Sequence, residues 1–205
     1  GLLEQKTNNY LASVIEDGDT AGVAYVDITT GEFATTQLPI MGLSLELARI
    51  SPAEVLVPDE QGLLLPTGDQ TAVGGQHFTP VNASSFDLNF CREALLSQYK
   101  TLSLESFGCE GLSLAVRAAG AIIDYLGRTY KTAKPQLGPL STYSTAAYMT
   151  LDAPTRRNLE LFEAGRAGSS QLSLLATLDR TKTPMGGRLL RRWLGQPLLD
   201  LAELS

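Results

Sequence analysis

Three short runs of β-branched and aromatic residues near the start of the chain constrain its fold most strongly. These runs are Tyr10–Ile15, Ala21–Thr29 and Glu32–Leu38. Residues 16–19 (Glu-Asp-Gly-Asp) and 29–31 (Thr-Thr-Gly) separate them, and Asp and Gly tolerate the backbone angles that chain reversals need. The pattern predicts a three-stranded antiparallel meander.

After the meander, the spacing of apolar residues changes from that of a strand to that of a helix. Apolar residues recur at helical spacing between residues 42 and 50, and Pro52 stops a helix from continuing past Ser51. Glu54–Val57, between two prolines, reads as a short apolar strand. A meander, a helix and a further strand open an RNase H-like arrangement, in which that last strand lies parallel beside the first. The sequence therefore predicts an α/β domain with a mixed sheet and flanking helices.

Two further helices are predicted after a weakly patterned stretch. Residues 61–85 are rich in glycine and interrupted by proline, so we expect mostly loop there, with a possible strand at His77–Val81. A helix is predicted over Asp87–Tyr99, with Phe90, Ala94 and Leu95 on its covered side. The longest helix is predicted over Leu112–Tyr130, where an apolar stripe suits packing on a sheet and Ala119 and Gly120 permit close approach.

A stretch with two prolines and a glycine divides the chain. Lys134–Pro139 ends the helical pattern, and Ser, Thr and Tyr fill the next positions. We predict an entry segment at 1–8, the α/β domain at 9–133, a linker at 134–146 and a truncated helical domain at 147–205. An extended segment is expected at Ala147–Leu151.

Short helices with sharp starts are predicted in the last third. One enters at Asp152 or Ala153 and runs through Phe162, because Asp accepts hydrogen bonds from free N–H groups and Pro154 presets φ. Another spans Leu172–Leu178, with Ser169 or Ser170 as its cap. The pair Thr183-Pro184 starts a third helix.

This third helix carries an apolar stripe, with arginines opposite. The stripe comprises Met185, Leu189, Leu190, Trp193 and Leu194. We expect Met185, Leu189, Trp193 and Leu194 to serve interdomain packing, either folding back on the α/β domain or becoming buried in a second copy. Arg156, Arg157, Arg188, Arg191 and Arg192 form clusters that we interpret as solvated or paired helix faces, with DNA phosphate contact as the alternative.

Several strings in the chain closely resemble the MutS family of DNA mismatch-recognition proteins. LDAPTRRNLELFE, SLLATLDRTKTPMGGRLLRRWL and the closing QPL resemble the start of the MutS core domain. GVAYVDITTGEF, and more weakly FGCEG, resemble the MutS connector domain, so the resemblance covers nearly the whole chain. The chain starts without Met and stops inside a helical pattern, and we expect it to be a piece of a longer protein.

The resemblance implies a role without a reactive centre of its own. It implies a connector and core segment that couples mismatch binding to an ATPase elsewhere in the protein and contributes to MutL recruitment. Implied partners are the remaining MutS domains, MutL and mismatched double-stranded DNA bound through other domains, in a homodimer. ATP and Mg²⁺ are expected in the parent protein only. We assign no catalytic, cofactor or metal residue here, and place Arg92, Glu93 and Lys100 on a candidate partner surface.

Composition agrees with a cytoplasmic interaction module. The 205 residues include two cysteines and one histidine, which leaves no zinc-ligand pattern and favours free thiols in a reducing compartment. No apolar run is long enough to span a membrane, and no secretory signal pattern is present. Residues 1–140 carry 8 basic and 16 acidic side chains, a net charge of −8, which disfavours sequence-independent DNA binding by that region.

A metal-dependent nuclease is the alternative that the expected fold raises. RNase H-like nucleases hold two Mg²⁺ ions between carboxylates, and this chain has Asp27, Glu46, Asp59 and Asp124 on or near the expected elements. The first strand, however, offers only Leu11, Ala12, Ser13 and Val14 where the leading ligand is needed. Asp27 also precedes a turn that its side chain could stabilise. We therefore interpret these carboxylates as structural and keep the nuclease as the second hypothesis.

Overall fold

The computed structural model describes residues 10–59, 77–130, 136–145, 155, 158–162, 170–195 and 197. The chain forms two compact units. One unit comprises Asn9–Thr145, and the other comprises Gly1–Asn8 with Ala146–Ser205. Each unit is described separately below, beginning with the α/β unit of residues 9–145.

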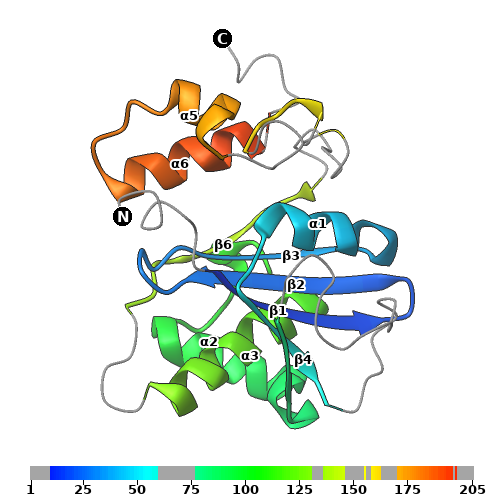
Figure 1. Cartoon of the computed structure of the whole chain (residues 1–205). Helices are drawn as coiled ribbons and strands as arrows, with labels where there is room; N and C mark the ends of the chain where they lie inside the picture. The colour runs from blue at the N-terminus through cyan, green and yellow to red at the C-terminus, as the bar shows by residue number, and fades with distance from the viewer. Residues whose placement is uncertain are drawn as a thin grey trace. The chain divides into compact units, whose positions relative to one another are not determined.

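A six-stranded mixed sheet forms the centre of the α/β unit (Figure 1). Its strands are β1 (Tyr10–Asp17), β2 (Thr20–Asp27), β3 (Phe33–Pro39), β4 (Glu54–Pro58), β5 (His77–Val81) and β6 (Leu140–Thr142). The order across the sheet is β5-β4-β1-β2-β3-β6. β1, β2 and β3 are antiparallel neighbours, and β4 lies parallel beside β1. The predicted meander and the predicted parallel fourth strand are both confirmed.

Tight turns hold the meander in register. Gly18 joins β1 to β2 with φ of +57°, and Gly31 joins β2 to β3 with φ of +76°. These left-handed conformations favour glycine because other residues place Cβ too close to the backbone. At Gly31 a Cβ would also lie 2.3 Å from the carbonyl oxygen of Gln136, so glycine is required there twice over.

Helices cover both faces of the sheet (Figure 1). α1 (Leu43–Ile50) covers one face, and it ends where Ser51 adopts a left-handed φ of +50° and Pro52 follows. The apolar cluster on this side, the α1 side, consists of Tyr10, Ala12, Val14, Ala21, Val23, Tyr25, Ala34, Leu38, Leu43, Leu47, Ile50, Val55 and Val57. The alternation of these residues with polar or opposite-facing ones follows from the two-residue period of strands.

The other face of the sheet is covered by α2 (Leu88–Tyr99) and α3 (Ser113–Thr129). Asp87 caps α2, because its Oδ1 accepts a hydrogen bond from Phe90 N–H at 2.9 Å. The start of α3 lies directly on β2, where a Cβ on Gly22 would be 2.2 Å from the carbonyl oxygen of Leu114. The two 3₁₀ turns η3 (Ala83–Phe86) and η4 (Glu105–Phe107) complete this layer.

Two predictions for this layer need comment. Both helices lie within one residue of their predicted bounds, which confirms them. Phe90 was predicted on the covered side of α2, and this is wrong: Phe90 is 43% exposed, while Cys91 and Leu95 are fully buried. Phe90, Cys91 and Leu95 are all apolar, so the helical period did not decide which of two adjacent positions, 90 or 91, faces the core.

The segment predicted as a linker, 134–146, contributes a strand. Its residues Leu140–Thr142 form β6, which pairs parallel to β3. The possible strand at His77–Val81 is confirmed as β5, which pairs parallel to β4. A three-residue strand is too short to produce a periodic signal, so sequence alone suggested only a polar connection.

The second unit contains short helices. They are the 3₁₀ turn η6 (Ser170–Leu172), α5 (Leu174–Leu178) and α6 (Pro184–Gly195). α6 begins at Pro184 as predicted, with Thr183 Oγ1 accepting from Gly186 N–H at 3.1 Å. The predicted cap of α5 is corrected from Ser169 or Ser170 to Ser173, whose Oγ accepts from Ala176 N–H at 3.2 Å.

Some predictions fall on residues outside those the structure describes. The predicted extended segment Ala147–Leu151 lies wholly outside them, as does the start of the helix at Asp152 or Ala153. Of that helix, Thr155 and Asn158 are helical. Within the described ranges, the structure has no helix with the length and apolar character that crossing a membrane requires.

Candidate functional site

Asp27, the first of the four carboxylates considered as metal ligands, organises the turn between β2 and β3. Its Oδ1 accepts hydrogen bonds from the backbone N–H groups of Thr29 at 2.8 Å and Thr30 at 3.2 Å. The backbone closes the same turn, since Gly31 N–H donates to the carbonyl oxygen of Asp27 at 2.8 Å. Asp27 thus has the turn-stabilising role that the sequence indicated.

Glu46 lies on the covered side of α1 and is only 5% exposed. It forms an ion pair with Arg49, one turn later on the same helix, and Arg49 Nε donates to its Oε2 at 2.9 Å. The hydroxyl of Tyr143 donates to Glu46 Oε1 at 2.6 Å. Three donors therefore satisfy this buried carboxylate, as a charge removed from water requires.

Asp59 and Asp124 accept hydrogen bonds in two other parts of the α/β unit. Asp59, just after β4, accepts from Ala83 N–H at 3.0 Å and so joins the strand to η3. Asp124 on α3 accepts from Arg128 Nε at 3.0 Å, one turn later on the exposed side of the helix.

The structure does not bring the four carboxylates together. Asp27 and Glu46 lie on the α1 side of the sheet, whereas Asp124 belongs to the helix that covers the opposite face. Among the described residues, no group of three or more His, Cys, Asp or Glu side chains is placed to hold a metal ion. The nuclease alternative therefore gains no support from the arrangement of these side chains.

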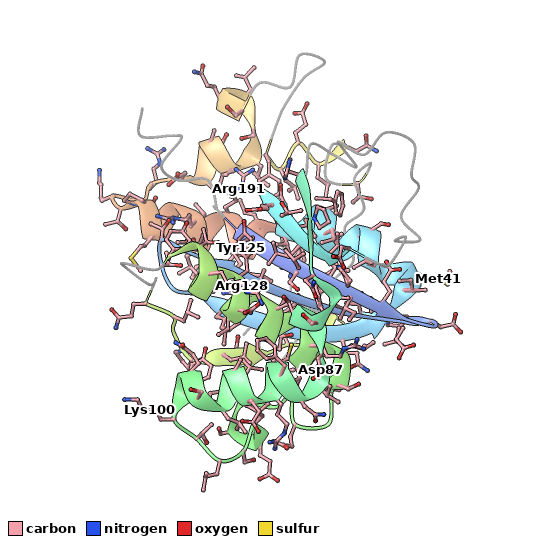
Figure 2. All side chains as sticks on the ribbon, turned by 90° about the horizontal axis from the view of Figure 1, so that it is seen from below. Met41, Asp87, Lys100, Tyr125, Arg128 and Arg191 are labelled. Atoms are coloured by element: carbon pink, nitrogen blue, oxygen red, sulfur yellow. The ribbon has the colours of Figure 1, made fainter. Side chains whose placement is uncertain are left out.

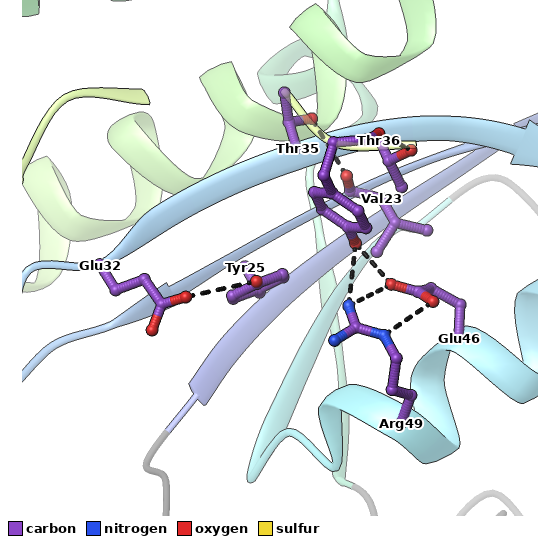
Figure 3. Close-up of polar contacts among 8 residues, drawn as sticks. Val23, Tyr25, Glu32, Thr35, Thr36, Glu46 and Arg49 are labelled. Carbon is purple, nitrogen blue, oxygen red and sulfur yellow. Dashed lines mark hydrogen bonds and ion pairs between the residues drawn. The ribbon is translucent and has the colours of Figure 1, made fainter. Parts of the chain in front are cut away.

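A polar cluster that the sequence did not reveal lies on the α1 side (Figure 3). We call it the tyrosine cluster, and it comprises Tyr10, Tyr25, Glu32, Glu46, Arg49 and Tyr143. The hydroxyls of Tyr10 and Tyr25 donate to the two carboxylate oxygens of Glu32, at 3.1 and 3.4 Å. The rings of Tyr10 and Tyr25 meet edge to face, 4.9 Å apart.

Arg49 joins the two halves of the tyrosine cluster. Its guanidinium carbon lies 5.8 Å from the centre of the Tyr25 ring and 5.3 Å from that of Tyr143, within the range of cation–π attraction. Burial by itself would lower the pKa of Arg49, but the hydrogen bond and the charge of Glu46 outweigh it, so the pKa lies above its ordinary value. Burial and the neighbouring Glu46 charge raise the pKa of Tyr143 well above its ordinary value. Arg49 stays charged and Tyr143 stays neutral.

The predicted partner surface on α2 combines exposed side chains with one that forms an ion pair. Glu93 and Lys100 are exposed, and Figure 2 shows Lys100 pointing outward at the end of α2. Arg92 instead forms an ion pair with Glu110, whose Oε2 also accepts from Leu104 N–H at 2.6 Å. The hydrogen bond from Arg92 is the main cause that lowers the pKa of Glu110. Arg92 therefore has a structural partner as well as an exposed surface.

Within the second unit, the predicted interdomain stripe on α6 is largely uncovered. Met185 is 65% exposed, Leu189 44% and Trp193 64%, while Leu194 is half-buried. The covered side of α6 instead holds Gly187 and Arg191, whose guanidinium carbon lies 4.5 Å from the centre of the Phe162 ring. Trp193 does not belong to the core of this unit. Arg156 and Arg157 lie outside the described residues.

Family comparisons agree with this division of the chain. The family model described as MutS domain II matches residues 9–141, which form most of the α/β unit. The model described as MutS domain III matches residues 154–205, which belong to the second unit.

Curated relatives that carry the name DNA mismatch repair protein MutS align with the whole chain. The protein from Dehalococcoides mccartyi strain CBDB1 is 42% identical over 204 residues, and that from Thermosynechococcus vestitus is 44% identical over 214. Both alignments cover 100% of this chain but only 23% and 24% of the relatives' own lengths. Two consecutive MutS family models match this chain, and the chain is similar to MutS proteins over all of its own length. The chain therefore belongs to the MutS family.

Proposed function

We propose that this chain is a non-catalytic connector and core segment that couples mismatch binding to an ATPase in other domains of a MutS protein. The observation that carries the proposal is the division into two compact units that match consecutive MutS domains. The relatives are about four times longer than this chain. The nucleotide, Mg²⁺ and mismatched DNA would therefore bind to parts of the protein beyond this segment.

The build of the α/β unit supports a mechanical role. Its sheet has an apolar layer on both faces, and the tyrosine cluster joins α1 to Tyr25 of β2 and to Tyr143 after β6. The strand order β3-β2-β1-β4-β5, with β4 parallel to β1, supports the RNase H-like interpretation. A unit packed on both faces moves as one body, and a rigid body can pass a displacement between two sites.

The exposed stripe of α6 supports a place within a larger assembly. The exposed apolar side chains of this helix are Met185, Leu189 and Trp193. Keeping them in contact with water costs free energy, and such a patch is typical of a surface that another domain covers. We infer that further MutS domains cover it in a cytoplasmic homodimer. Displacement of those domains would then reach the α/β unit through the residues around 146–153, which lie between the two family matches.

The connection between the units offers the direct test of coupling. The chain is substituted for its matching segment in the full-length Dehalococcoides mccartyi MutS, and four glycines are inserted between Ala146 and Ala147. Flexible residues absorb displacement, so we expect mismatch affinity to persist while ATP-triggered clamp formation on DNA slows by about tenfold. The same insertion after Gly18, in the β1–β2 turn, is the control. Equal clamp rates in the two insertion proteins would reject the coupling role.

MutL recruitment is the second part of the proposal, and it involves the surface of α2. Glu93 and Lys100 are exposed on this helix, as are Leu88 and Phe90 near its start, at 39% and 43%. Exposed apolar side chains together with charged ones are typical of transient interfaces.

A charge exchange separates this surface from stability. Glu93→Arg together with Lys100→Glu reverses the two exposed charges and leaves the Arg92–Glu110 pair and the hydrogen bond from Leu104 N–H to Glu110 in place. We expect at least about a tenfold loss of MutL affinity, because like charges meet at the interface. Asp19→Lys, in the turn before β2, is the matched control. Unchanged MutL affinity in the exchanged protein would exclude α2 as the recruitment surface.

A further inference from the structure

The α/β unit ends in a strand that side chains hold more firmly than its backbone ladder does. β6 has three residues and lies at the edge of the sheet, where, among the strands that the structure describes, it pairs with β3, from Phe33↔Leu140 to Thr35↔Thr142. Each backbone hydrogen bond contributes about 1 kcal/mol net to stability. The few bonds between β6 and β3 therefore stabilise β6 only slightly. The side chains around β6 therefore decide whether it stays in place.

Tyr143, the residue after β6, makes contacts with two elements. From β3, Thr36 Oγ1 donates to its carbonyl oxygen at 2.7 Å, and its own N–H donates to the carbonyl oxygen of Thr35 at 3.1 Å. From α1, Glu46 accepts its hydroxyl at 2.6 Å and Arg49 donates to that hydroxyl oxygen at 3.3 Å. Figure 3 shows Glu46 and Arg49 reaching from α1 toward the sheet.

Two contacts on the opposite face complete the attachment. The hydroxyl of Tyr99 donates to the carbonyl oxygen of Gly138 at 2.8 Å, and Thr142 Oγ1 donates to that of Phe107 at 2.6 Å. Both bonds are part-buried, and Leu140 of β6 is only 3% exposed in the core on this face, so detachment also exposes an apolar side chain.

The Glu46–Arg49 pair lowers the free-energy cost of detaching Tyr143 from α1. Its two members bond to each other along one helix turn, so loss of Tyr143 would leave neither charge without its opposite. Removal of one partner from a buried pair costs far more than hydration of an intact pair. The contact of Tyr143 with this pair can therefore open and close without unfolding α1.

We propose that residues 136–143 form a latch: β6 detaches as a unit while the rest of the sheet stays folded, and the Tyr143 hydroxyl on the Glu46–Arg49 pair holds it closed. Opening would free residues 136–143, which span up to about 28 Å when extended. The connection between the two units would lengthen accordingly. This last consequence rests on the proposed coupling function, whereas the latch itself does not.

Hydrogen exchange measured by mass spectrometry on the 205-residue chain tests the latch without DNA or nucleotide. In the wild type, we expect the amides of residues 140–143 to exchange at least about tenfold faster than those of β1 and β2, because local opening costs less than global unfolding. Tyr143→Phe removes only the hydroxyl and should accelerate exchange in 140–143 by roughly another fivefold, with β1 and β2 unchanged.

Tyr125→Phe is the matched control, because it also removes a hydroxyl that donates to a glutamate, Glu54 Oε1, at 2.9 Å. It should leave exchange in residues 140–143 at the wild-type rate. Equal exchange rates in β6 and β1 of the wild type would overturn the latch, as would a Tyr143→Phe protein in which all strands accelerate alike. A failed coupling experiment in the chimeric MutS would leave the exchange result standing.

Discussion

Gly120 on α3 faces Cys91 on α2 so closely that a Cβ built on Gly120 would lie 2.3 Å from the Cβ of Cys91 and 2.5 Å from its Cα. The two helices can reach this separation only because one of them has no side chain at the contact. Gly120→Ala must push α2 and α3 apart, and we expect the free energy of unfolding to fall by about 1–3 kcal/mol. Urea unfolding measures this change.

Gly127 supplies the control for that substitution. It lies on the same helix, but a Cβ there would meet nothing within 4 Å. Gly127→Ala should stabilise the chain by about 0.5–1 kcal/mol through helix propensity alone. A loss of stability at Gly127 equal to that at Gly120 would show that the close helix contact is absent.

Ser13, at the centre of β1, is expected to reduce stability. Its side chain is fully buried, and its Oγ has no hydrogen-bond partner among the residues that the structure describes. A buried hydroxyl without a partner costs about 1–3 kcal/mol, and about 1 kcal/mol shifts Tm by roughly 2–4 °C in a chain of this size, so Ser13→Ala should raise Tm by at least about 2 °C. Calorimetry gives the value.

Thr35 provides the opposite case on the neighbouring region of the sheet. Its hydroxyl lies 3.0 Å from the carbonyl oxygen of Val23 and 2.9 Å from that of Ala115, which links β3 to α3. Thr35→Val keeps the shape and removes the bond, and should lower the free energy of unfolding by about 1 kcal/mol. If both substitutions shift Tm in the same direction, hydroxyl pairing does not explain either effect.

The Glu46–Arg49 pair should show strong coupling. Arg49→Met leaves the Glu46 carboxylate buried beside α1 without its counter-charge, and should cost about 3–5 kcal/mol. Adding Glu46→Leu removes the charge that was left behind, so the double variant should be more stable than Arg49→Met alone. Denaturant titrations of the four proteins in the cycle test this, and additive effects would contradict it.

Alkaline pH should weaken the fold through Cys91. Burial raises the pKa of its thiol from 9.0 to about 12. Between these values the folded chain holds a proton that the unfolded chain has lost, so the free energy of unfolding falls as pH rises, by at most about 1.4 kcal/mol per pH unit. Below pH 9 the contribution is fully present.

Unfolding free energies at three pH values between 8 and 11 check this expectation in the wild type and in Cys91→Ala. The variant should lose stability less steeply with pH, although the cavity lowers its stability at every pH. Tyr99, whose pKa burial raises to about 12, keeps some slope in both proteins. Parallel curves would exclude Cys91 as a cause.

The elements with strong local signals were predictable from the sequence. The meander, α1, α2, α3 and the start of α6 follow from turn residues, helix caps and periodicity. The cap of α5 was assigned to Ser169 or Ser170 instead of Ser173, because three serines near one helix start are locally equivalent and only the tertiary fold selects among them.

The tyrosine cluster could not be predicted, because its members meet only through the sheet. Glu46 and Tyr143 are 97 residues apart, and no local pattern relates them. Glu46 was a candidate metal ligand because the sequence does not distinguish a helical carboxylate that binds a metal ion from one that pairs with an arginine. The i, i+3 spacing of Glu46 and Arg49 was the one available signal, and such pairs occur on most helices.

The pairing of β6 with β3 also sets the order in which the α/β unit can be completed during synthesis. The hydrogen bond from Thr36 to Tyr143 joins residues 107 positions apart, whereas β1, β2 and β3 are joined by short turns and can pair before β6 has been translated. Until Tyr143 has been translated, β3 remains an open edge that other nascent chains can pair with. Addition of the final strand therefore replaces the seven-residue edge of β3 with the three-residue edge of β6, and a shorter edge offers less backbone for such pairing.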